Sequence, residues 1–395
     1  MKNEKLVLFL LAVVQFTHIM DFMIVMPLGA QFMKIFDISP FEFTLIVSSY
    51  ALAAGVAGFF GAMYIDRFGR KKVLLFIYIG FTIGTLACAA APNYFILLLS
   101  RSLSGAFGGL LGALVLAIVA DIVPLERRGR AMGIIMMAFS VASVAGVPVG
   151  LLLAAQYSWR MPFICVASLS FITILLIIRF VPSLSTHLEN GKKALHPFKV
   201  IENLFKDHNQ ILALGFSIVL MLGHFTIIPF IAPYMQLNVG FTEFQITYIY
   251  LVGGTLTAFL LPYFGKLSDQ YGHVRIFTIS SILAVFSIFA ITTLPAVPIA
   301  VALLATSSFF VVASGRNVPA TTMVTSVVNS ESRASFMSFR VSANQGALFI
   351  SSIIAGSIIG TKEDGSLTNY PIVGFIAIVM SLVAIILARK LKLKA

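Results

Sequence analysis

The densest charged run in the sequence is Ala62-Met63-Tyr64-Ile65-Asp66-Arg67-Phe68-Gly69-Arg70-Lys71-Lys72, which lies between two long apolar segments. A second run, Gly265-Lys266-Leu267-Ser268-Asp269-Gln270-Tyr271-Gly272-His273, repeats its Asp-x-x-Gly core between two other apolar segments. Asp66 and Asp269 are separated by 203 positions, and so are the glycines of the two cores. Because a repeat of this length halves a 395-residue chain, the sequence predicts two homologous bundles.

The composition is that of a membrane protein. The mean hydropathy is +1.00, and only 11% of the residues are charged, against about 25% in soluble domains. Many apolar runs reach the roughly 18–20 residues that cross about 30 Å of hydrocarbon as a helix. The predicted class is therefore an all-α membrane protein. The net charge of +12 does not indicate a nucleic-acid partner, because the basic residues flank the apolar runs and form no groove-reading motif.

Twelve transmembrane helices are predicted, six in each half of the chain. The first six cover 6–32, 44–65, 73–91, 95–122, 131–154 and 161–181, and the second six cover 209–235, 243–265, 274–294, 297–323, 334–359 and 370–389. Residues 182–208 are the longest polar stretch and are interpreted as a linker. The predicted domains are thus a bundle over 1–181, a cytoplasmic linker over 182–208 and a bundle over 209–395.

The basic residues predict the orientation of these helices. With the N-terminus inside, 21 Lys and Arg residues fall in inner segments, and the outer segments hold only Lys34, Arg160 and Lys362. Because basic residues accumulate on the cytoplasmic side, we expect both termini there, in a bacterial-type inner cell membrane. The apolar run after Lys5 is too long for a signal peptide and is interpreted as the first membrane helix.

The charged loop and two further motifs carry a resemblance to a known family. Asp66-Arg67-x-Gly69-Arg70-Lys71-Lys72, between the second and third of twelve spans, resembles the loop signature of the major facilitator superfamily. Gly146-x-Pro148-x-Gly150 in the fifth span is similar to the antiporter motif of its drug/proton and sugar-efflux branches, although Val147 intervenes before the proline. Arg101-Ser102-Leu103-Ser104-Gly105 resembles the Arg-x-x-x-Gly of the same branches. The resemblance covers essentially the whole chain and implies two pseudo-symmetric six-helix bundles.

One carboxylate, Asp21, is predicted near the middle of a span. His18 and Gln15 precede it at three-residue intervals and share its helical face. The 203-residue offset relates Asp21 to His224 in the seventh span, and Phe22 to Phe225. The resemblance implies that the first and seventh spans line a central cavity. We therefore predict proton coupling by Asp21, His18 and His224, with a purely structural role as the alternative for each.

Arg101 is the predicted partner of Asp21. It lies about 9 Å below the outer surface in the fourth span, within reach of the carboxylate. The resemblance ties this arginine to proton coupling, so protonation of Asp21 would release Arg101. The alternative is a static pair that fixes helix packing. Arg316 and Arg340 have no acidic residue in their own spans and are interpreted either as anion ligands or as snorkelling side chains.

The predicted substrate is a small neutral or amphipathic molecule, because phenylalanine is abundant, at 36 residues, and the candidate cavity helices carry few charges. A sugar or metabolite is the alternative. The candidate substrate-binding residues are Gln15, Asp21, Phe22, His224, Phe225, Arg316, Asn344 and Gln345. The resemblance further implies a conformational latch formed by Asp66, Arg67, Gly69, Arg70, Asp121, Asp269 and Gly272. It also implies a helix bend at Gly146, Pro148 and Gly150.

Several function classes are excluded by motifs that the sequence lacks. It has no phosphate-binding loop, no metalloprotease helix and no serine-hydrolase elbow, so neither enzyme activity nor a cofactor or metal is expected. It also lacks the repeated selectivity element of a channel. The expected function is proton-coupled export by alternating access, with uptake symport or an uncoupled facilitator as alternatives. The expected partners are a small-molecule substrate, protons and the lipid bilayer, and the chain is expected to act as a monomer.

Overall fold

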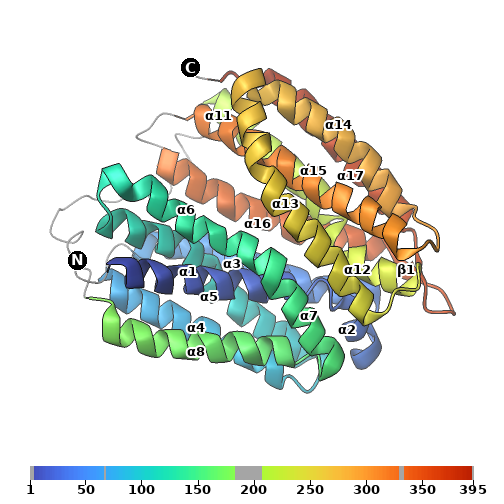
Figure 1. The fold of residues 1–395 in the computed structure, drawn as a ribbon, viewed down its shortest axis with the longest axis horizontal. Helices are drawn as coiled ribbons and strands as arrows, with labels where there is room; N and C mark the ends of the chain where they lie inside the picture. Colours follow the sequence, from blue (N-terminus) through green and yellow to red (C-terminus); the bar gives the residue numbers. More distant parts are fainter. Residues whose placement is uncertain (1–3, 66–67, 183–206, 329–332, 394–395) are drawn as a thin grey trace. The chain divides into compact units, whose positions relative to one another are not determined.

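The computed structural model describes residues 4–65, 68–182, 207–328 and 333–393. Within these ranges, twelve helices are long and apolar enough to cross a membrane, which confirms the predicted class (Figure 1). The contacts divide the chain into two compact units. Unit 1 comprises Met1–Val25 and Ser49–Pro197, and unit 2 comprises Met26–Ser48 and Phe198–Ala395. The predicted boundary at 182–208 stays a prediction, because most of that linker lies outside the described ranges.

Unit 1 is built from antiparallel helices. Its helices are α1 (Glu4–Ile24), the later part of α3 (Pro40–Ile65), α4 (Arg70–Ala90), α5 (Tyr94–Ile122), α6 (Leu125–Val141), the π-helical turn η1 (Ala142–Gly146), α7 (Val147–Gln156) and α8 (Met161–Phe180). Helix α4 packs along α5 and α8, and α1 packs along α5, α6 and α8 (Figure 1). Asn93 starts α5 by accepting a hydrogen bond from the Ile96 amide at 2.9 Å.

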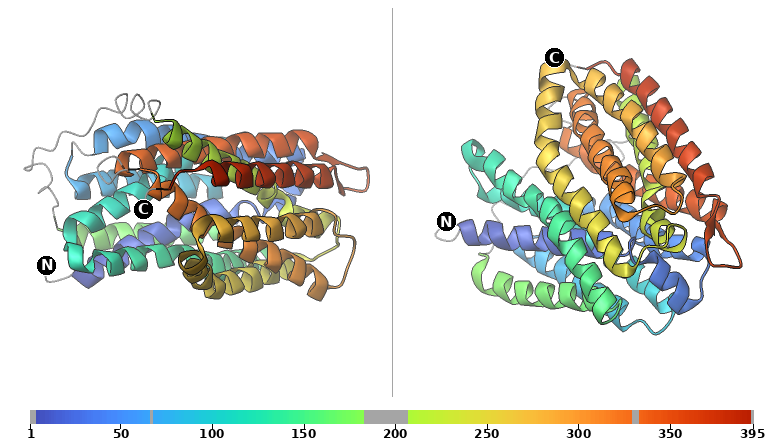
Figure 2. Two further views of the ribbon diagram at one scale, coloured as in Figure 1. Left: turned by 90° about the horizontal axis from the view of Figure 1, so that it is seen from above. Right: turned by 45° about the vertical axis from the view of Figure 1, so that its right-hand side comes forward.

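Unit 2 follows the same plan. Its elements are α2 (Gly29–Phe36), the start of α3, α11 (His208–Phe225), α12 (Ile228–Leu237), α13 (Glu243–Tyr271), α14 (His273–Thr292), α15 (Ile299–Ser326), α16 (Arg333–Ile358), β1 (Gly360–Thr361), β2 (Leu367–Thr368) and α17 (Tyr370–Lys390). Helix α15 packs between α13 and α14, and α17 packs on α11 and α14 (Figure 2). The two short strands form an antiparallel hairpin in which Gly360 pairs with Thr368.

The internal repeat is visible in the helix bounds. Helix α3 begins at Pro40 and α13 at Glu243, while α4 begins at Arg70 and α14 at His273. Both pairs are 203 positions apart, the spacing found between the two Asp-x-x-Gly cores. The two halves of the sequence therefore form corresponding helices in the same register.

The first membrane span is not the continuous helix predicted over 6–32. Helix α1 ends at Ile24 and α2 begins at Gly29, with Pro27 between them. The helix stops here because proline has no N–H for the ladder and its ring clashes with the preceding turn. The seventh span is interrupted in the same way at Thr226 and Ile227, just before Pro229. Both halves thus break their first span at corresponding places.

The segment after the first break belongs to unit 2. There α2 packs against α12. Gly29 permits this contact, because a Cβ at that position would lie 2.8 Å from the Pro233 ring. The Phe43 ring meets Phe230 edge to face at 5.7 Å. Residues 26–48 are therefore held by the helices of the second half of the chain.

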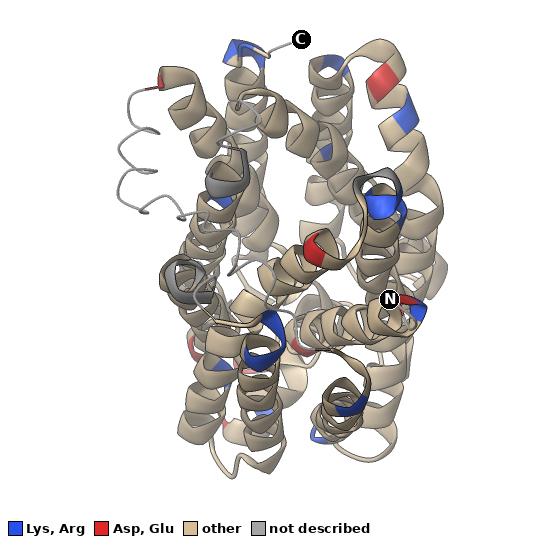
Figure 3. Ribbon diagram, turned by 90° about the vertical axis from the view of Figure 1, so that its left-hand side faces the viewer, with Lys and Arg blue, Asp and Glu red and all other residues tan. Residues whose placement is uncertain are grey.

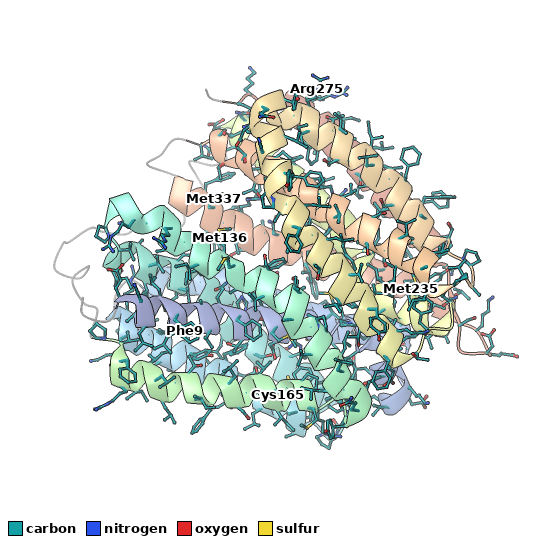
Figure 4. The ribbon with its side chains drawn as sticks, viewed as in Figure 1. Phe9, Met136, Cys165, Met235, Arg275 and Met337 are labelled. Atoms are coloured by element: carbon teal, nitrogen blue, oxygen red, sulfur yellow. The ribbon has the colours of Figure 1, made fainter. Side chains whose placement is uncertain are left out.

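The distribution of side chains fits a bilayer. Large apolar side chains are exposed on the outer faces of helices, among them Phe9 at 61% and Met136 at 71% (Figure 4). Charged residues gather mainly at the helix ends, where Figure 3 shows most of the Lys, Arg, Asp and Glu positions. Exposing such apolar faces to water would cost free energy, whereas lipid chains cover them without this cost. With twelve apolar helices among its described residues, the chain is a multi-pass membrane protein.

Candidate functional site

A fully buried ion pair lies within unit 1. The Arg101 Nη1 atom lies 2.7 Å from Asp21 Oδ2, with side chains 1% and 0% exposed. The same nitrogen donates to the Asp21 backbone carbonyl at 3.2 Å. Thr85 on α4 donates its hydroxyl to Asp21 Oδ1, also at 3.2 Å. Both carboxylate oxygens are therefore bound by side chains from other helices, as a buried charge requires.

Three helices position this pair. Asp21 lies in the last turn of α1, three residues before the helix ends at Ile24. Arg101 lies in the second turn of α5, whose first residue is Tyr94. The third helix, α4, supplies Thr85, which donates to the carboxylate. Asp21 stands in the last helical turn before Pro27 interrupts the first span. The predicted Asp21–Arg101 pair is present.

Tyr50 extends the cluster to His18. Its ring lies under the Arg101 guanidinium, with 4.5 Å from Cζ to the ring centroid. Its hydroxyl is 3.0 Å from His18 Nδ1. Gly105 and Gly108 make this possible, because a Cβ at either position would overlap Tyr50. His18, Tyr50, Arg101 and Asp21 thus form one continuous chain of contacts, which we call the Asp21 cluster, with Thr85 as its fifth member.

Two further predicted residues of α1 border the Asp21 cluster. The Phe22 ring lies 5.4 Å from the Tyr50 ring. Gln15 is one turn before His18, and its Oε1 atom is buried with no hydrogen-bond partner among the described residues. An unsatisfied amide oxygen beside a polar cluster is suited to accept a hydrogen bond from a ligand.

His224 lies in the last turn of α11, immediately before the break in the seventh span. Its imidazole stacks on Phe309, with 6.1 Å between the ring centroids, and meets Phe225 edge to face at 5.3 Å. The Nδ1 atom is buried and has no hydrogen-bond partner among the described residues. His224 therefore presents a polar atom inside an aromatic surrounding.

Arg316 on α15 is 1% exposed. Its Nη1 atom donates to the Ser381 hydroxyl of α17 at 3.0 Å. Its Nε and Nη2 atoms are buried without a partner in the described part of the chain. Phe309, the ring on which His224 stacks, lies seven residues before Arg316 on α15, and this spacing puts both on the same face of that helix. Arg316 and His224 therefore share one region of unit 2, which we call the Arg316 cluster.

The other predicted polar residues of unit 2 lie on α16. Arg340 Nε donates to the Ser217 hydroxyl at 2.8 Å, and that hydroxyl donates to Asn344 Oδ1 at 3.0 Å. Asn344 is thus used in joining α16 to α11. Gln345 is the next residue of α16 and is partly buried. Arg340 is 8% exposed and directed to these partners, and the structure gives it no contact with the Arg316 cluster.

The predicted latch is described only in part. Asp66 and Arg67 lie outside the described residues. Gly69 precedes α4, and the predicted pair of Arg70 and Asp121 is present, with 2.9 Å between Nε and Oδ2. In the second half, Gly272 has φ +91, a conformation that favours glycine, and it joins α13 to α14. Asp269 is exposed in the last turn of α13.

The predicted bend motif lies on η1 and α7. Gly146 ends the π-helical turn, and Pro148 is the second residue of α7. A π-helical turn accommodates the missing N–H of a following proline. A Cβ at Gly146 or Gly150 would approach the Met20 side chain of α1 to 2.9 or 2.6 Å. The glycines therefore allow α7 to lie close to α1.

Sequence reasoning missed two members of the Asp21 cluster, Thr85 and Tyr50. Each is one of many Thr and Tyr residues in the spans, and each reaches the cluster from another helix.

No group of three or more His, Cys, Asp and Glu side chains able to hold a metal occurs among the described residues.

Comparisons with known proteins fit this architecture. The model of the Major Facilitator Superfamily matches residues 11–312 and 213–394. The chain is 27% identical over 227 residues to the inner membrane transport protein YdhP of Escherichia coli (strain K12), covering 57% of each chain. It is 25% identical over 290 residues to multidrug resistance protein 2 of Bacillus subtilis (strain 168), covering 69% of this chain and 70% of that one.

A shorter match is 36% identical over 137 residues to the vacuolar membrane amino acid uptake transporter fnx2 of Schizosaccharomyces pombe, covering 35% of this chain and 23% of that protein. The alignments to fnx2 and YdhP span less than two thirds of those proteins.

Solved structures share the fold. The nucleoside transporter NupG superposes with a TM-score of 0.80 at 14% identity, covering 98% of this chain and all of that one. A D-xylose-proton symporter superposes with a TM-score of 0.77 at 17% identity, covering 98% of this chain and 96% of that one. Together with the family model, these likenesses lead to one conclusion. This chain belongs to the major facilitator superfamily, whose members are membrane transporters and not enzymes.

Proposed function

We propose that this transporter exports small neutral or amphipathic molecules, of the kind that includes drugs, in exchange for protons by alternating access. The observation that carries the proposal is the buried Asp21–Arg101 pair, with 2.7 Å between its atoms. Removing two charges from water costs as much as their attraction returns, so such a pair adds little to stability. An ionisable group inside a membrane span is by default a functional one.

Asp21 is the member of the pair that can change charge, because an arginine stays protonated. A proton on Asp21 would cancel the attraction that holds Arg101 Nη1 against it. Arg101 would keep its contact with the Tyr50 ring. The packing of α1 against α5 would then have two arrangements, one for each protonation state, and substrate binding would favour one of them. This is the coupling that an antiporter needs.

The export direction is supported by the resemblance of unit 1 motifs to the antiporter branches and by the likeness to multidrug resistance protein 2. Uptake is the second candidate, favoured by the likeness to fnx2, which is named as an uptake transporter. Both directions use the same fold. They are distinguished by whether substrate and proton cross the membrane in opposite directions or together.

The remaining features of the proposal follow from the sequence. The excess of Lys and Arg in alternate loops supports cytoplasmic termini and an inner cell membrane of bacterial type. The Arg70–Asp121 pair supports a latch role for the charged loop, in which Asp66 and Arg67 would take part. The transporter is proposed to work as a monomer.

Proton flux in inside-out vesicles tests the proposal. A pH-sensitive dye would report the collapse of an imposed proton gradient as lipophilic cations, sugars, amino acids and aryl carboxylates are added in turn. The parent protein is compared with Asp21→Asn and with Glu363→Gln, which makes the same chemical change at an exposed hairpin residue.

We expect a substrate-dependent collapse in the parent and in Glu363→Gln, and its loss in Asp21→Asn. A collapse that persists in Asp21→Asn would show that Asp21 does not couple protons, and His224 would be tested next. A labelled solute that equilibrates without any proton movement would replace antiport by facilitated diffusion.

A further inference from the structure

Arg316 is a buried cation that has no carboxylate partner among the described residues. The acidic residues of unit 2 that the structure describes lie at helix ends or in the hairpin. They are Asp37, Glu42, Asp207, Glu243, Asp269, Glu363 and Asp364. Within the described part of the chain, the one hydrogen bond that Arg316 makes is its donation to the Ser381 hydroxyl, a neutral acceptor. An arginine cannot give up its proton to relieve burial, and an uncompensated charge in the membrane interior is costly. The site is therefore incomplete without an anion.

The unused atoms define the shape of that anion. The two nitrogens of Arg316 that have no hydrogen-bond partner in the described ranges are Nε and Nη2. These two nitrogens share one edge of the planar guanidinium, from which two N–H groups point in parallel. A carboxylate matches this edge with two hydrogen bonds, whereas the ammonium of a lysine does not offer it. The edge left open is thus the one used for bidentate recognition.

The surroundings of Arg316 add an apolar contact to the charge. His224 contacts the Phe225 and Phe309 rings, and Phe309 lies two helical turns before Arg316 on the same face of α15. The His224 Nδ1 atom is buried and has no hydrogen-bond partner among the described residues. His224 lies beside the break between α11 and α12. Interrupted helices at corresponding places in two repeats commonly mark the substrate site of a transporter. One fixed cation favours a monoanion over a phosphate dianion.

We propose that Arg316, with His224, binds the carboxylate of an amphipathic substrate whose apolar part lies against Phe225 and Phe309. This inference rests on the proposed function, since it names the substrate class for the same transport cycle. It narrows the class from neutral or amphipathic molecules to monocarboxylates with an apolar body. In this arrangement Asp21 and Arg101 handle the proton, and Arg316 handles the substrate.

Binding of matched acid and amide probes tests the inference. The purified transporter in detergent is titrated with radiolabelled 4-phenylbutyrate, 4-phenylbutyramide and three further pairs of aryl or alkyl acids and their amides. The proteins are the parent, Arg316→Gln, Arg316→Lys and the control Arg340→Gln. Arg340 is the matched control, because its Nε is already bound by Ser217.

The parent and Arg340→Gln are expected to bind at least one acid tenfold or more tightly than its amide. Arg316→Gln should abolish this difference, and Arg316→Lys should retain only part of it, because the charge stays while the parallel N–H groups are lost. Equal binding of every acid and its amide by the parent would overturn the inference. So would an undiminished preference for the acid in Arg316→Gln.

The Arg316→Lys variant and a chloride titration test the inference further. If Arg316→Gln does not fold, an unreduced preference for the acid in Arg316→Lys overturns the inference. A chloride titration is run in parallel, because a free halide offers the same charge. If chloride alone raises the melting temperature in an Arg316-dependent manner and the acids add nothing, the guanidinium holds a structural anion and the substrate subsite is rejected.

Failure of the inference is distinguishable from failure of the proposed function. Acid binding that depends on Arg316 but is accompanied by no proton movement would refute antiport and leave the subsite intact. Proton flux that depends on Asp21 without any preference for acids would leave antiport intact and refute the subsite. Acid binding is expected to persist in Asp21→Asn.

Discussion

The first membrane span of each half of the chain is interrupted at a corresponding place, but the side chains next to the two interruptions differ. Asp21 in unit 1 corresponds to His224 in unit 2 by the 203-residue offset. The other members of the Asp21 cluster correspond to apolar residues or glycine in the second half. In the order His18, Tyr50, Thr85 and Arg101, these counterparts are Met221, Gly253, Ile288 and Leu304.

The same contrast holds in the packing. Where unit 1 places the Tyr50 ring beside an arginine, unit 2 has Gly253, and the Phe310 ring fills the space. Unit 2 has its own buried arginine, Arg316, on the helix that corresponds to α5, but at a different height. The repeat thus preserves the backbone and its breaks, while each half carries its own chemistry. We propose that one half serves the proton and the other half an anion.

The largest expected effect separates the two buried arginines. Asp21→Leu leaves Arg101 buried without its counter-charge and should cost about 3–5 kcal/mol of folding free energy. The double variant Asp21→Leu/Arg101→Met should recover most of this loss, because no isolated charge remains. Arg316→Gln should cost nothing or raise stability, because it removes a charge that already lacks a partner. Denaturant unfolding in detergent measures all three.

An equal loss of unfolding free energy in Asp21→Leu and Arg316→Gln would contradict this comparison, because the side chain of Arg316 would then contribute to stability as much as the Asp21–Arg101 pair does. A double variant no better than Asp21→Leu would show that the pair is needed for packing. In that case the two-arrangement account of proton coupling would lose its physical basis.

A smaller effect is expected at the glycines of α5 that seat Tyr50. A Cβ at Gly105 would lie 2.7 Å from the Tyr50 Cα, so Gly105→Ala must push α3 away from α5. Overpacking of this kind costs about 1–3 kcal/mol. Gly112→Ala is the matched control, because its nearest neighbour, Gln15 Nε2, is 3.9 Å away. It should be neutral or slightly stabilising, since alanine is the better helix former.

Thermal unfolding of the two variants measures this difference. If Gly105→Ala and Gly112→Ala melt at the same temperature, the close approach of α3 to α5 does not hold Tyr50 in place. Unit 1 would then lack the close packing that distinguishes the surroundings of its arginine from the corresponding region of unit 2.

Much of this architecture was predictable, because it depends on local composition and on one repeat. Apolar length and the Asp-x-x-Gly spacing predicted the membrane class and the family. The depth of Asp21 and Arg101 in their spans predicted that they meet. The prediction of one helix over 6–32 was wrong, because the long apolar run outweighed Pro27, whose missing N–H ends α1 at Ile24.

The members of the Asp21 cluster that were missed are neutral polar residues. A carboxylate in an apolar span stands out because its burial is costly, but a threonine or tyrosine does not. Thr85 bonds a residue 64 positions away, and Tyr50 bonds one 32 positions away. Such contacts depend on which helices pack together, which no local pattern specifies. Arg316 was visible in the sequence, but its open guanidinium edge was not.

The smallest effect concerns the Tyr50 hydroxyl. Tyr50→Phe keeps the ring beside Arg101 and removes only the hydrogen bond to His18 Nδ1, so it should cost about 1 kcal/mol. Tyr50→Leu also removes the contact with the cation and should cost more, by about 1–2 kcal/mol. A double-mutant cycle with His18→Leu tests whether this stability cost comes from the bond to His18, because in the His18→Leu background the hydroxyl has no imidazole to bond.

In that cycle, removal of the hydroxyl should cost measurably less in the His18→Leu background than in the parent. A cost of the same size in both backgrounds would show that the hydroxyl does not act through His18. The Asp21 cluster would then end at the Tyr50 ring. His18 would then be separate from the Asp21–Arg101 pair, as His224 is separate from the carboxylates described in unit 2.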